Sequence, residues 1–398
     1  MSQRPDIVTR PNPSAAGILG RQTSLLTAVA HATFAVYGGM VTAIGPTVPS
    51  IAGDFALTLG EAGTIFAVGG VGFILVVFLG GAVADALGKR GVLVAGLLAA
   101  AVGSVGMGLS PNFGLLLAAA FVGNVGSGLL ESAVGGLVVD LHPKRRTAAL
   151  NLVHSFFGWG ALAGPLFAGA LLVAAGWRWV YVGLALPFTV LALFTVRQRF
   201  PPPSAEQPIR WGDVRTLLGS RLIRLAILGI LLYVAGELSL SAWGFPYLET
   251  VRGYPTMVAS LGVSILWAAI AIGRWASAGL SAHLSPARLV QAGSCLCAAG
   301  TVLLLLSPVP VLALAALAVA GLGASAIYPT IMSVACARFP RFSGTVTGLI
   351  TTATGLGVLL GPAAVGRLGD VLGLQQALLA VVVAMLLVAA IYQSRSAE

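Results

Sequence analysis

Residues 123–165 read GNVGSGLLESAVGGLVVDLHPKRRTAALNLVHSFFGWGALAGP, with two long apolar segments on either side of the basic turn HPKRR. Each apolar segment contains an ionisable side chain, Glu131 in the first and His154 in the second. A carboxyl and an imidazole are costly to keep inside segments that can cross a bilayer, and such groups mark functional sites. The stretch therefore predicts a membrane-spanning helical hairpin that contains part of a site.

The composition indicates that the rest of the chain lies in the membrane too. Of the 398 residues, 58% are hydrophobic and 9% are charged, and glycine occurs 52 times. These values are typical of an integral membrane protein whose helices approach closely through small residues. Three cysteines, Cys295, Cys297 and Cys336, fall in apolar segments, which predicts packing and neither a disulfide nor a metal site. We expect no cofactor.

Apolar runs of about 20 residues, enough to cross a bilayer as a helix, recur along the chain. They predict helices near 25–48, 61–83, 91–109, 113–139, 147–174, 178–196, 222–248, 257–281, 287–306, 309–335, 344–369 and 374–393. The long polar segment 197–221, rich in proline and arginine, predicts a cytoplasmic linker. We therefore expect an all-α membrane protein with twelve transmembrane helices in two pseudo-symmetric six-helix bundles, 25–196 and 222–393, and with cytoplasmic tails at 1–24 and 394–398.

An internal repeat supports this division. When the sequence is shifted by 197 positions, Gly39 falls on Gly236, and the pair Gly164 and Pro165 falls on the pair Gly361 and Pro362. Parallel repeats predict two halves related by an axis along the membrane normal, with a binding site between them near the midplane. Glycine and proline within a helix bend it, so these two pairs are predicted helix hinges.

The net charge of +10 describes topology and not nucleic-acid binding. Of the 22 Lys and Arg residues, 18 fall in the tails and in alternate loops. The positive-inside rule then places both termini in the cytoplasm, and the polar start of the chain lacks the features of a signal peptide. We expect a multi-pass protein of the cell (inner) membrane, a monomer whose partners are the lipid bilayer, a small-molecule substrate and protons, with Na⁺ left open.

The loop GAVADALGKR at 81–90 contains Asp85, Gly88, Lys89 and Arg90. Glycine permits a tight turn, and a carboxylate beside basic groups can hold one helix bundle against another. Together with the layout of twelve helices in two halves, its spacing resembles the signature loop of the major facilitator superfamily. The resemblance implies a transporter and not an enzyme, with this loop taking part in gating.

Three further segments resemble the fucose-permease branch of that family: SGLLES around Glu131, LNLVHSFFGWGALAGP at 150–165, and YVAGELSLSAW at 233–243. Most members of this branch are proton-coupled sugar symporters, which implies proton-coupled uptake of a sugar or similar small polar metabolite. The helix-1 aspartate of that branch is absent, since only Thr42 is polar near its place. Fucose itself is therefore not the expected substrate.

Glu131 and His154 are the predicted proton-coupling residues. At a rise of about 1.5 Å per residue, both lie roughly 12–13 Å inside their helices, so they could touch if the helices are neighbours. A carboxyl in the membrane interior resists ionisation, which suits proton exchange. The alternative for Glu131 is a neutral carboxyl bound to a backbone carbonyl, and the alternative for His154 is a structural hydrogen bond.

The substrate-binding candidates combine hydroxyls, a flat ring and charges, which suits sugars and flat organic molecules alike. They are Glu237, Trp243, Arg274, Tyr328, Asn151 and Tyr233, with His31, Tyr37 and Asn124 as weaker candidates. Trp243 could instead anchor a helix end at the membrane interface. Arg274 could pair with Glu237, bind an anionic group, or extend to the cytoplasmic edge.

Two rival functions remain. The sequence GALAGP at 160–165 has the form of the helix-5 motif in proton-driven drug exporters, so efflux of a drug or metabolite is the alternative to uptake. The same glycines could simply let helices pack closely. A membrane enzyme or sensor is the third possibility, but the sequence contains no nucleotide loop, metal cluster or catalytic triad that would favour it.

Overall fold

Helical hydrogen bonds dominate the structure, because backbone polar groups in hydrocarbon must find partners within their own segment. The computed structural model describes residues 13–143, 145–200, 211–280 and 283–393, leaving aside the side chains of 13–21, 77–87, 147, 211 and 278, and all regular elements described are helices. These are α1 (Pro13–Phe55), α2 (Leu59–Leu109), α3 (Phe113–Leu141), α4 (Arg146–Ala174), α5 (Trp177–Thr195), α6 (Trp211–Gly219), α7 (Arg221–Pro246), η1 (Tyr247–Val251), α8 (Thr256–Leu280), α9 (Pro286–Leu306), α10 (Pro310–Ala324), α11 (Ile327–Arg338), η2 (Pro340–Phe342), α12 (Ser343–Leu372), α13 (Leu374–Ala377) and α14 (Leu379–Gln393).

Within the described residues, 12 helical stretches are long and apolar enough to cross a membrane. The predicted all-α fold with twelve transmembrane helices is therefore confirmed. Helix α2 contains the second and third spans, which meet at Gly88, where φ is 66° and ψ is 162°. Glycine adopts this left-handed conformation readily because it has no Cβ. Two other spans are built from helix pairs, α10 with α11 and α13 with α14.

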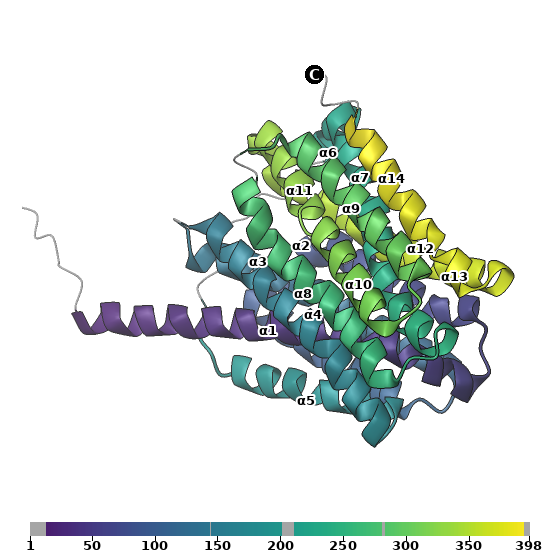
Figure 1. The fold of residues 1–398 in the computed structure, drawn as a ribbon. Coiled ribbons are helices and arrows are strands. Elements are labelled where there is room, and N and C mark those ends of the chain that lie inside the picture. Colours follow the sequence, from purple (N-terminus) through teal and green to yellow (C-terminus); the bar gives the residue numbers. More distant parts are fainter. Residues whose placement is uncertain (1–12, 144, 201–210, 281–282, 394–398) are drawn as a thin grey trace, which may run out of the picture.

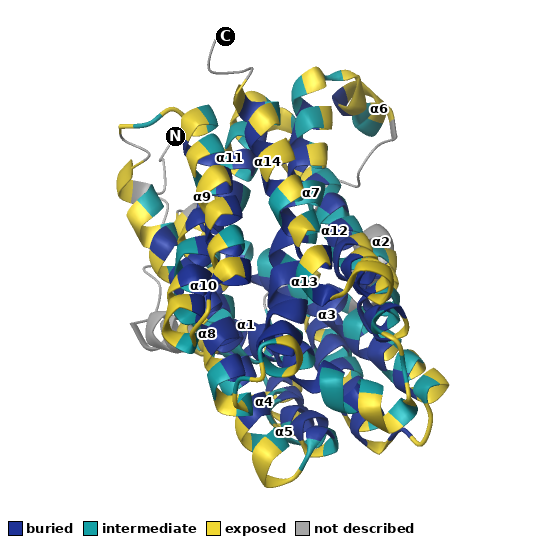
Figure 2. Ribbon diagram, turned by 45° about the vertical axis from the view of Figure 1, so that its right-hand side comes forward, coloured by how far each residue is buried: buried dark blue, intermediate teal, exposed yellow. Residues whose placement is uncertain are grey.

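The outer surface is strongly apolar. Large hydrophobic side chains such as Val371, Trp275 and Leu109 are 81%, 73% and 68% exposed. Figure 2 shows exposed residues along the outer flanks of the helices, while buried residues gather on the inward sides. Such an apolar surface suits contact with lipid and would not remain soluble in water.

Helix α6 lies inside the segment predicted to be only a linker. It has nine residues and begins with Asp213 in its first turn, where a negative charge is favourable. The Arg224 guanidinium on α7 donates to the carbonyls of Leu218 and Gly219, at 2.9 Å each. We call the face that carries α6 the linker face, and Figure 2 shows α6 at that end of the bundle.

The two halves use the same helix pairs. In the first half α1 packs against α4, and α2 against α3 and α5. In the second half α7 packs against α12, and α9 against α10 and α14. The labels in Figure 1 locate these elements, and the pair α1 and α4 corresponds to the pair α7 and α12. Helices that correspond in the internal repeat of 197 positions therefore pack against corresponding partners.

Glycines sit where the backbones of these pairs touch. A Cβ atom on Gly160 would lie 1.7 Å from the carbonyl oxygen of Ala35, and one on Gly361 would lie 2.4 Å from that of Ala235. Small residues let membrane helices approach this closely without a side chain between them. The predicted hinge glycines Gly164 and Gly361 are therefore contact points, and their hinge motion stays a prediction.

Pro165 lies inside α4 and leaves the carbonyl of Ala161 without its usual helical donor. The Thr42 hydroxyl of α1 donates to that carbonyl oxygen at 3.0 Å. A carbonyl freed by proline in a membrane must find another partner, so this bond ties α1 to α4. Thr42 thus stabilises the helix pair at the position where the fucose-permease branch has an aspartate.

We predict that Gly160→Ala destabilises the protein by about 1–3 kcal/mol, because the new methyl group must push α1 away from α4. The apparent melting temperature in detergent should fall by several degrees. Gly135→Ala on α3 is the matched control, since a Cβ there meets nothing within 4 Å. Equal melting temperatures for the two variants would contradict the close contact of α1 with α4.

Candidate functional site

The two bundles meet on the face opposite the linker face, through α2 with α12 and α4 with α8. At the membrane edge, the backbone N–H of Gly60 in the first turn of α2 donates to Oδ2 of Asp370 on α12 at 2.9 Å. Deeper in, a Cβ on Gly355 would lie 2.4 Å from the Ile74 side chain. The contact between bundles thus extends about 20 Å inward along α2 from Gly60 to Ile74, and it closes the opposite face.

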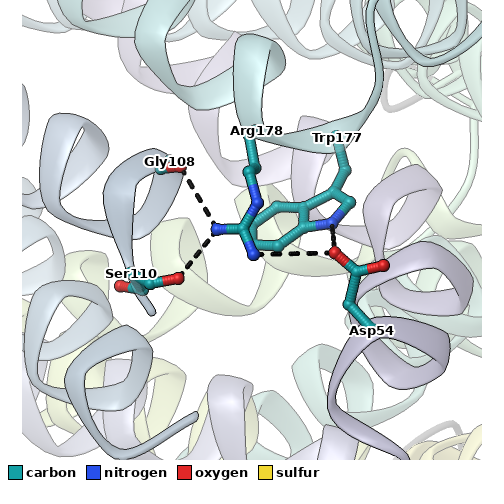
Figure 3. Close-up of polar contacts among 5 residues, drawn as sticks. All are labelled: Asp54, Gly108, Ser110, Trp177 and Arg178. Carbon is teal, nitrogen blue, oxygen red and sulfur yellow. Dashed lines mark hydrogen bonds and ion pairs between the residues drawn. The ribbon is translucent and has the colours of Figure 1, made fainter. Parts of the chain in front are cut away.

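A polar cluster ties the helix ends together on that same face (Figure 3). Arg178 at the start of α5 donates to the carbonyl of Ser110 at 2.7 Å and lies 3.6 Å from the carboxylate of Asp54. Its guanidinium stacks 4.4 Å from the Trp177 ring, whose indole N–H donates to Asp54 at 2.8 Å. The cluster fixes α1, α2 and α5 to one another, so the first bundle has a rigid end on this face.

Trp243, a predicted substrate-binding residue, is part of the closure. It is 0% exposed, and its indole N–H donates to the carbonyl of Pro362 at 2.8 Å. Its ring lies 6.3 Å from that of Phe66 on α2, in the other bundle. The interface anchor that was weighed for Trp243 does not apply, because the ring faces protein and not lipid headgroups.

A cavity of about 80 Å³ lies between the bundles, inside this closure. Residues from both halves line it, mostly apolar, with Asn124, Ser104, Ser241 and Tyr181 as polar members. It has room for several water molecules. Asn124 lies two helical turns nearer the opposite face than Glu131, so this cavity is separate from the charged groups described next.

Glu131 on α3 is partly exposed and lies within electrostatic range of two phenols, Tyr37 of α1 and Tyr328 of α11. Tyr328 belongs to the other bundle, and the hydroxyls of Thr351 and Thr354 lie beside it. No ion pair within 4 Å joins Glu131 to a described basic residue. The carboxyl therefore lies at the boundary of the two halves, among hydroxyl groups.

His154 on α4 is exposed, packs edge-on against Phe34 at 5.3 Å, and lies within electrostatic range of Arg274 on α8. Phe34 in turn contacts Tyr37 at 5.8 Å. The contacts found among the described residues do not join His154 directly to Glu131. Phe34 lies against His154, while Tyr37, which contacts Phe34, lies within electrostatic range of Glu131.

Glu237 on α7 is buried at 8% exposure and accepts a hydrogen bond of 2.5 Å from the Tyr233 hydroxyl, one turn earlier. Arg274 lies within electrostatic range of both. No ion pair shorter than 4 Å joins Arg274 to Glu237 or to another carboxylate in the described part of the chain. Tyr233 and Glu237 therefore form a hydrogen-bonded pair that is buried inside the second bundle.

Asn151 lies one turn before His154 on the same side of α4 and is exposed. The Ser155 hydroxyl donates to its backbone carbonyl at 2.9 Å, which leaves the amide side chain free for other contacts. Electrostatic range links Glu131 to Tyr328, Tyr328 to Arg274 and Arg274 to His154, so these partly exposed or exposed groups from both bundles form one cluster, with Asn151 one turn from His154. The cluster lies on the linker-face side of the cavity, since Glu131 is two turns nearer that face than Asn124.

The predicted gating loop is partly described. Gly88 has a positive φ, Arg90 is exposed, and the Lys89 ammonium pairs with Asp140 of α3 at 2.6 Å. The side chain of Asp85 lies outside the described residues. The ion pair of Lys89 is within the first bundle, so it stabilises α3 against α2 and does not itself bridge the two halves.

A sequence model of the Major Facilitator Superfamily matches residues 30–362 and, in a second match, residues 280–396. The chain belongs to the Major Facilitator Superfamily. It is therefore an integral, multi-pass membrane transporter and not an enzyme.

Relatives support this assignment. The chain is 26% identical to a TsgA homologue of Erwinia tasmaniensis, over 89% of this chain and 90% of that protein. It is 27% identical to an uncharacterised MFS-type transporter of Mycobacterium tuberculosis, over 83% of this chain but only 45% of the relative. The aligned region thus spans nearly all of the first relative and about half of the second.

Solved structures share the fold. A bacterial homologue of the human lysosomal transporter Spinster, in an inward-facing and unoccupied conformation, superposes with a TM-score of 0.79 at 18% identity, over 93% of this chain and 96% of that one. The nucleoside transporter NupG gives 0.78 at 14%, over 94% and 99%. The Escherichia coli fucose:proton symporter FucP gives 0.66 at 19%, again over 94% and 99%. FucP is thus one of several structural neighbours.

Asp370 is a residue of this transporter that the motif search missed. It belongs to GRLGDVLG at 366–373, which has the same spacing as GAVADALG at 81–88, and both segments end in a glycine with positive φ, Gly373 and Gly88. This recurrence was visible in the sequence, but not at the offset of 197. Asp370 binds the start of α2 in the other half, so it is a direct link between the bundles on the opposite face.

We predict that Asp370→Ala favours opening of the opposite face. A carboxylate at a helix N-terminus contributes up to about 1 kcal/mol when exposed to solvent, so its loss should raise the open population on the order of fivefold. A cysteine at Ser104, in the cavity, on a background without native cysteines, would report opening by its reaction rate with a membrane-impermeant thiol reagent. Asp213→Ala on α6 is the control, and unchanged labelling in Asp370→Ala would contradict the role of Asp370.

Proposed function

We propose that the chain moves a small polar metabolite together with a proton by alternating access. The observation that carries the proposal is Glu131, a carboxyl at membrane depth without a described basic partner, flanked by Tyr37 of its own bundle and Tyr328 of the other. A carboxyl at the boundary of two moving halves changes surroundings when the halves move. Its proton affinity then changes with conformation, which couples protonation to transport.

The other groups of the cluster around Glu131 have supporting roles in this proposal. His154 and Asn151 on α4 and Tyr328 on α11 offer hydrogen bonds to a solute from both bundles. Tyr233 and Glu237 are proposed to stabilise the second bundle through the hydrogen bond between them. Trp243 is proposed to reach the solute only after the closure between α2 and α12 has opened, because it is fully buried while that closure stands.

The two bundles, 25–196 and 222–393, are the proposed moving bodies, joined by the linker 197–221 with α6. The linker face is proposed to be the cytoplasmic side, so both tails, 1–24 and 394–398, would lie in the cytoplasm. The proposed location of the protein is the cell (inner) membrane. Lys and Arg gather on this face, as the positive-inside rule requires. The protein is proposed to act as a monomer, since the two bundles of a single chain supply site groups from both sides.

We favour uptake over efflux because of the structural neighbours, and because helix packing accounts for the motif that suggested efflux. Solved structures with the same fold include symporters whose names give fucose and D-xylose with protons. The motif at 160–165 that resembles drug exporters is accounted for by close contact, since Gly160 and Gly164 both touch α1. It therefore carries no information about direction.

We predict that Glu131→Gln loses proton-driven accumulation but keeps exchange. Glutamine preserves size and hydrogen bonding but cannot carry the proton, so counterflow in proteoliposomes should continue while uphill uptake falls to the equilibrium level at every pH. The assay uses the compound that gives the strongest counterflow in a panel of sugars, sugar acids and dyes. Ser132→Ala, the next residue on α3, is the control.

Uphill uptake by Glu131→Gln equal to that of the unsubstituted protein across pH would overturn the coupling role of Glu131. Accumulation driven by a Na⁺ gradient without a pH gradient would replace protons by Na⁺. Dye efflux driven by a pH gradient, with no exchange of sugars or sugar acids, would establish the export alternative.

A further inference from the structure

Arg274 is a cation inside the membrane-spanning part of α8 that has no counter-ion within 4 Å among the described residues. It lies six residues before the end of the helix at Leu280, about 9 Å along the axis. The ion pairs found among the described residues join Lys89 to Asp140 and Arg178 to Asp54, and neither involves Arg274. A guanidinium at this depth is costly unless something compensates its charge.

Glu237 lies within electrostatic range of Arg274 but forms no ion pair with it within 4 Å in the described part of the chain. One oxygen of Glu237 accepts the hydrogen bond from Tyr233, and the side chain is buried in the second bundle. The Nε atom of Arg274 is itself buried and has no hydrogen-bond partner. Guanidinium carries several N–H donors in one plane, so at least one of them awaits an acceptor that the described chain does not supply.

The guanidinium of Arg274 lies among groups from both bundles. It is partly exposed, and its electrostatic neighbours are Tyr233 and Glu237 on α7, Tyr328 on α11 and, from the first half, His154 on α4. A side chain that extended to the membrane edge would not lie near groups of both bundles. The positive charge of Arg274 therefore belongs to the same cluster as His154 and Tyr328, while its unpartnered Nε atom is buried within the protein.

We propose that the transported solute carries a carboxylate and that Arg274 binds it, with Tyr328 and His154 beside it as hydrogen-bonding neighbours. This rests on the proposed transport function and specifies its substrate class. A planar guanidinium matches a carboxylate with two parallel hydrogen bonds. A neutral sugar would leave the charge of Arg274 uncompensated, whereas a hydroxylated organic acid would satisfy both Arg274 and the hydroxyls around Tyr328.

The two charged positions then have complementary tasks. A monoanion on Arg274 and a proton on Glu131 together carry no net charge across the membrane. Coupled movement of a neutral sugar with a proton would instead carry one positive charge. In this proposal Glu131 of the first bundle carries the proton and Arg274 of the second bundle binds the anionic solute.

The test is ligand-dependent thermal stability of the purified protein, since a ligand of the folded state raises the melting temperature. The probes are matched pairs at millimolar concentration, D-gluconate with D-glucose, D-galacturonate with its methyl ester, and lactate with lactamide. The variants are Arg274→Gln, Arg274→Lys and, as a control on an exposed helix end, Arg288→Gln.

We expect at least one carboxylate to stabilise the protein while its neutral partner does not. Arg274→Gln should weaken that binding by more than about tenfold, since an unpaired anion would remain in the site. Arg274→Lys should restore part of it, and Arg288→Gln should leave it unchanged. Equal binding by Arg274→Gln, stabilisation by neutral probes alone, or no stabilisation by a carboxylate would each overturn the proposal.

Binding is measured here without a proton gradient, so the result is independent of proton coupling. Loss of carboxylate binding in Arg274→Gln would stand even if Glu131→Gln accumulated substrate normally, and then only the coupling role of Glu131 would fail. A neutral solute that accumulates with protons would leave the proposed function intact and refute the anion site.

Discussion

Close backbone contact between α1 and α4 sets the positions of the side chains at the centre of this transporter. Ala35 of α1 touches Gly160 of α4; Phe34 directly precedes Ala35 in α1, and Tyr37 follows it by two positions. Phe34 packs against His154, and Tyr37 lies within electrostatic range of Glu131. A larger residue at the contact would therefore displace both groups at once, which links the glycine content of the chain to its chemistry.

The second bundle repeats this packing but not the chemistry. Gly361 of α12 touches Ala235 of α7 in the same manner, yet the repeat places Tyr328 opposite Glu131. The proposed proton-binding carboxyl, Glu131, thus comes from one bundle, and the proposed anion-binding cation, Arg274, comes from the other. In the proposed mechanism, this asymmetry lets the two halves move as similar rigid bodies while the proton and the solute bind to different ones.

The sequence was sufficient for the fold because each span is a local property of length and hydropathy, and because the repeat at 197 positions fixes the pairing of helices. It also gave the depth of Glu131 and His154, since depth follows from counting residues along a helix. It could not give the rotation of each helix, because helices that are apolar all round lack a polar face to orient them. Direct contact of Glu131 with His154, and an open position for Trp243, both depended on rotation.

Distances between spin labels on the two faces test alternating access most directly. One pair would join Arg146→Cys to Ser343→Cys on the linker face, and the other Pro111→Cys to Pro308→Cys on the opposite face, each on a cysteine-free background and measured at acidic and alkaline pH. These four positions are exposed and correspond to each other in the repeat. The account predicts that conformers with a long distance on one face have a short distance on the other. Distances that lengthen or shorten together on both faces, or that do not change on either, would contradict it.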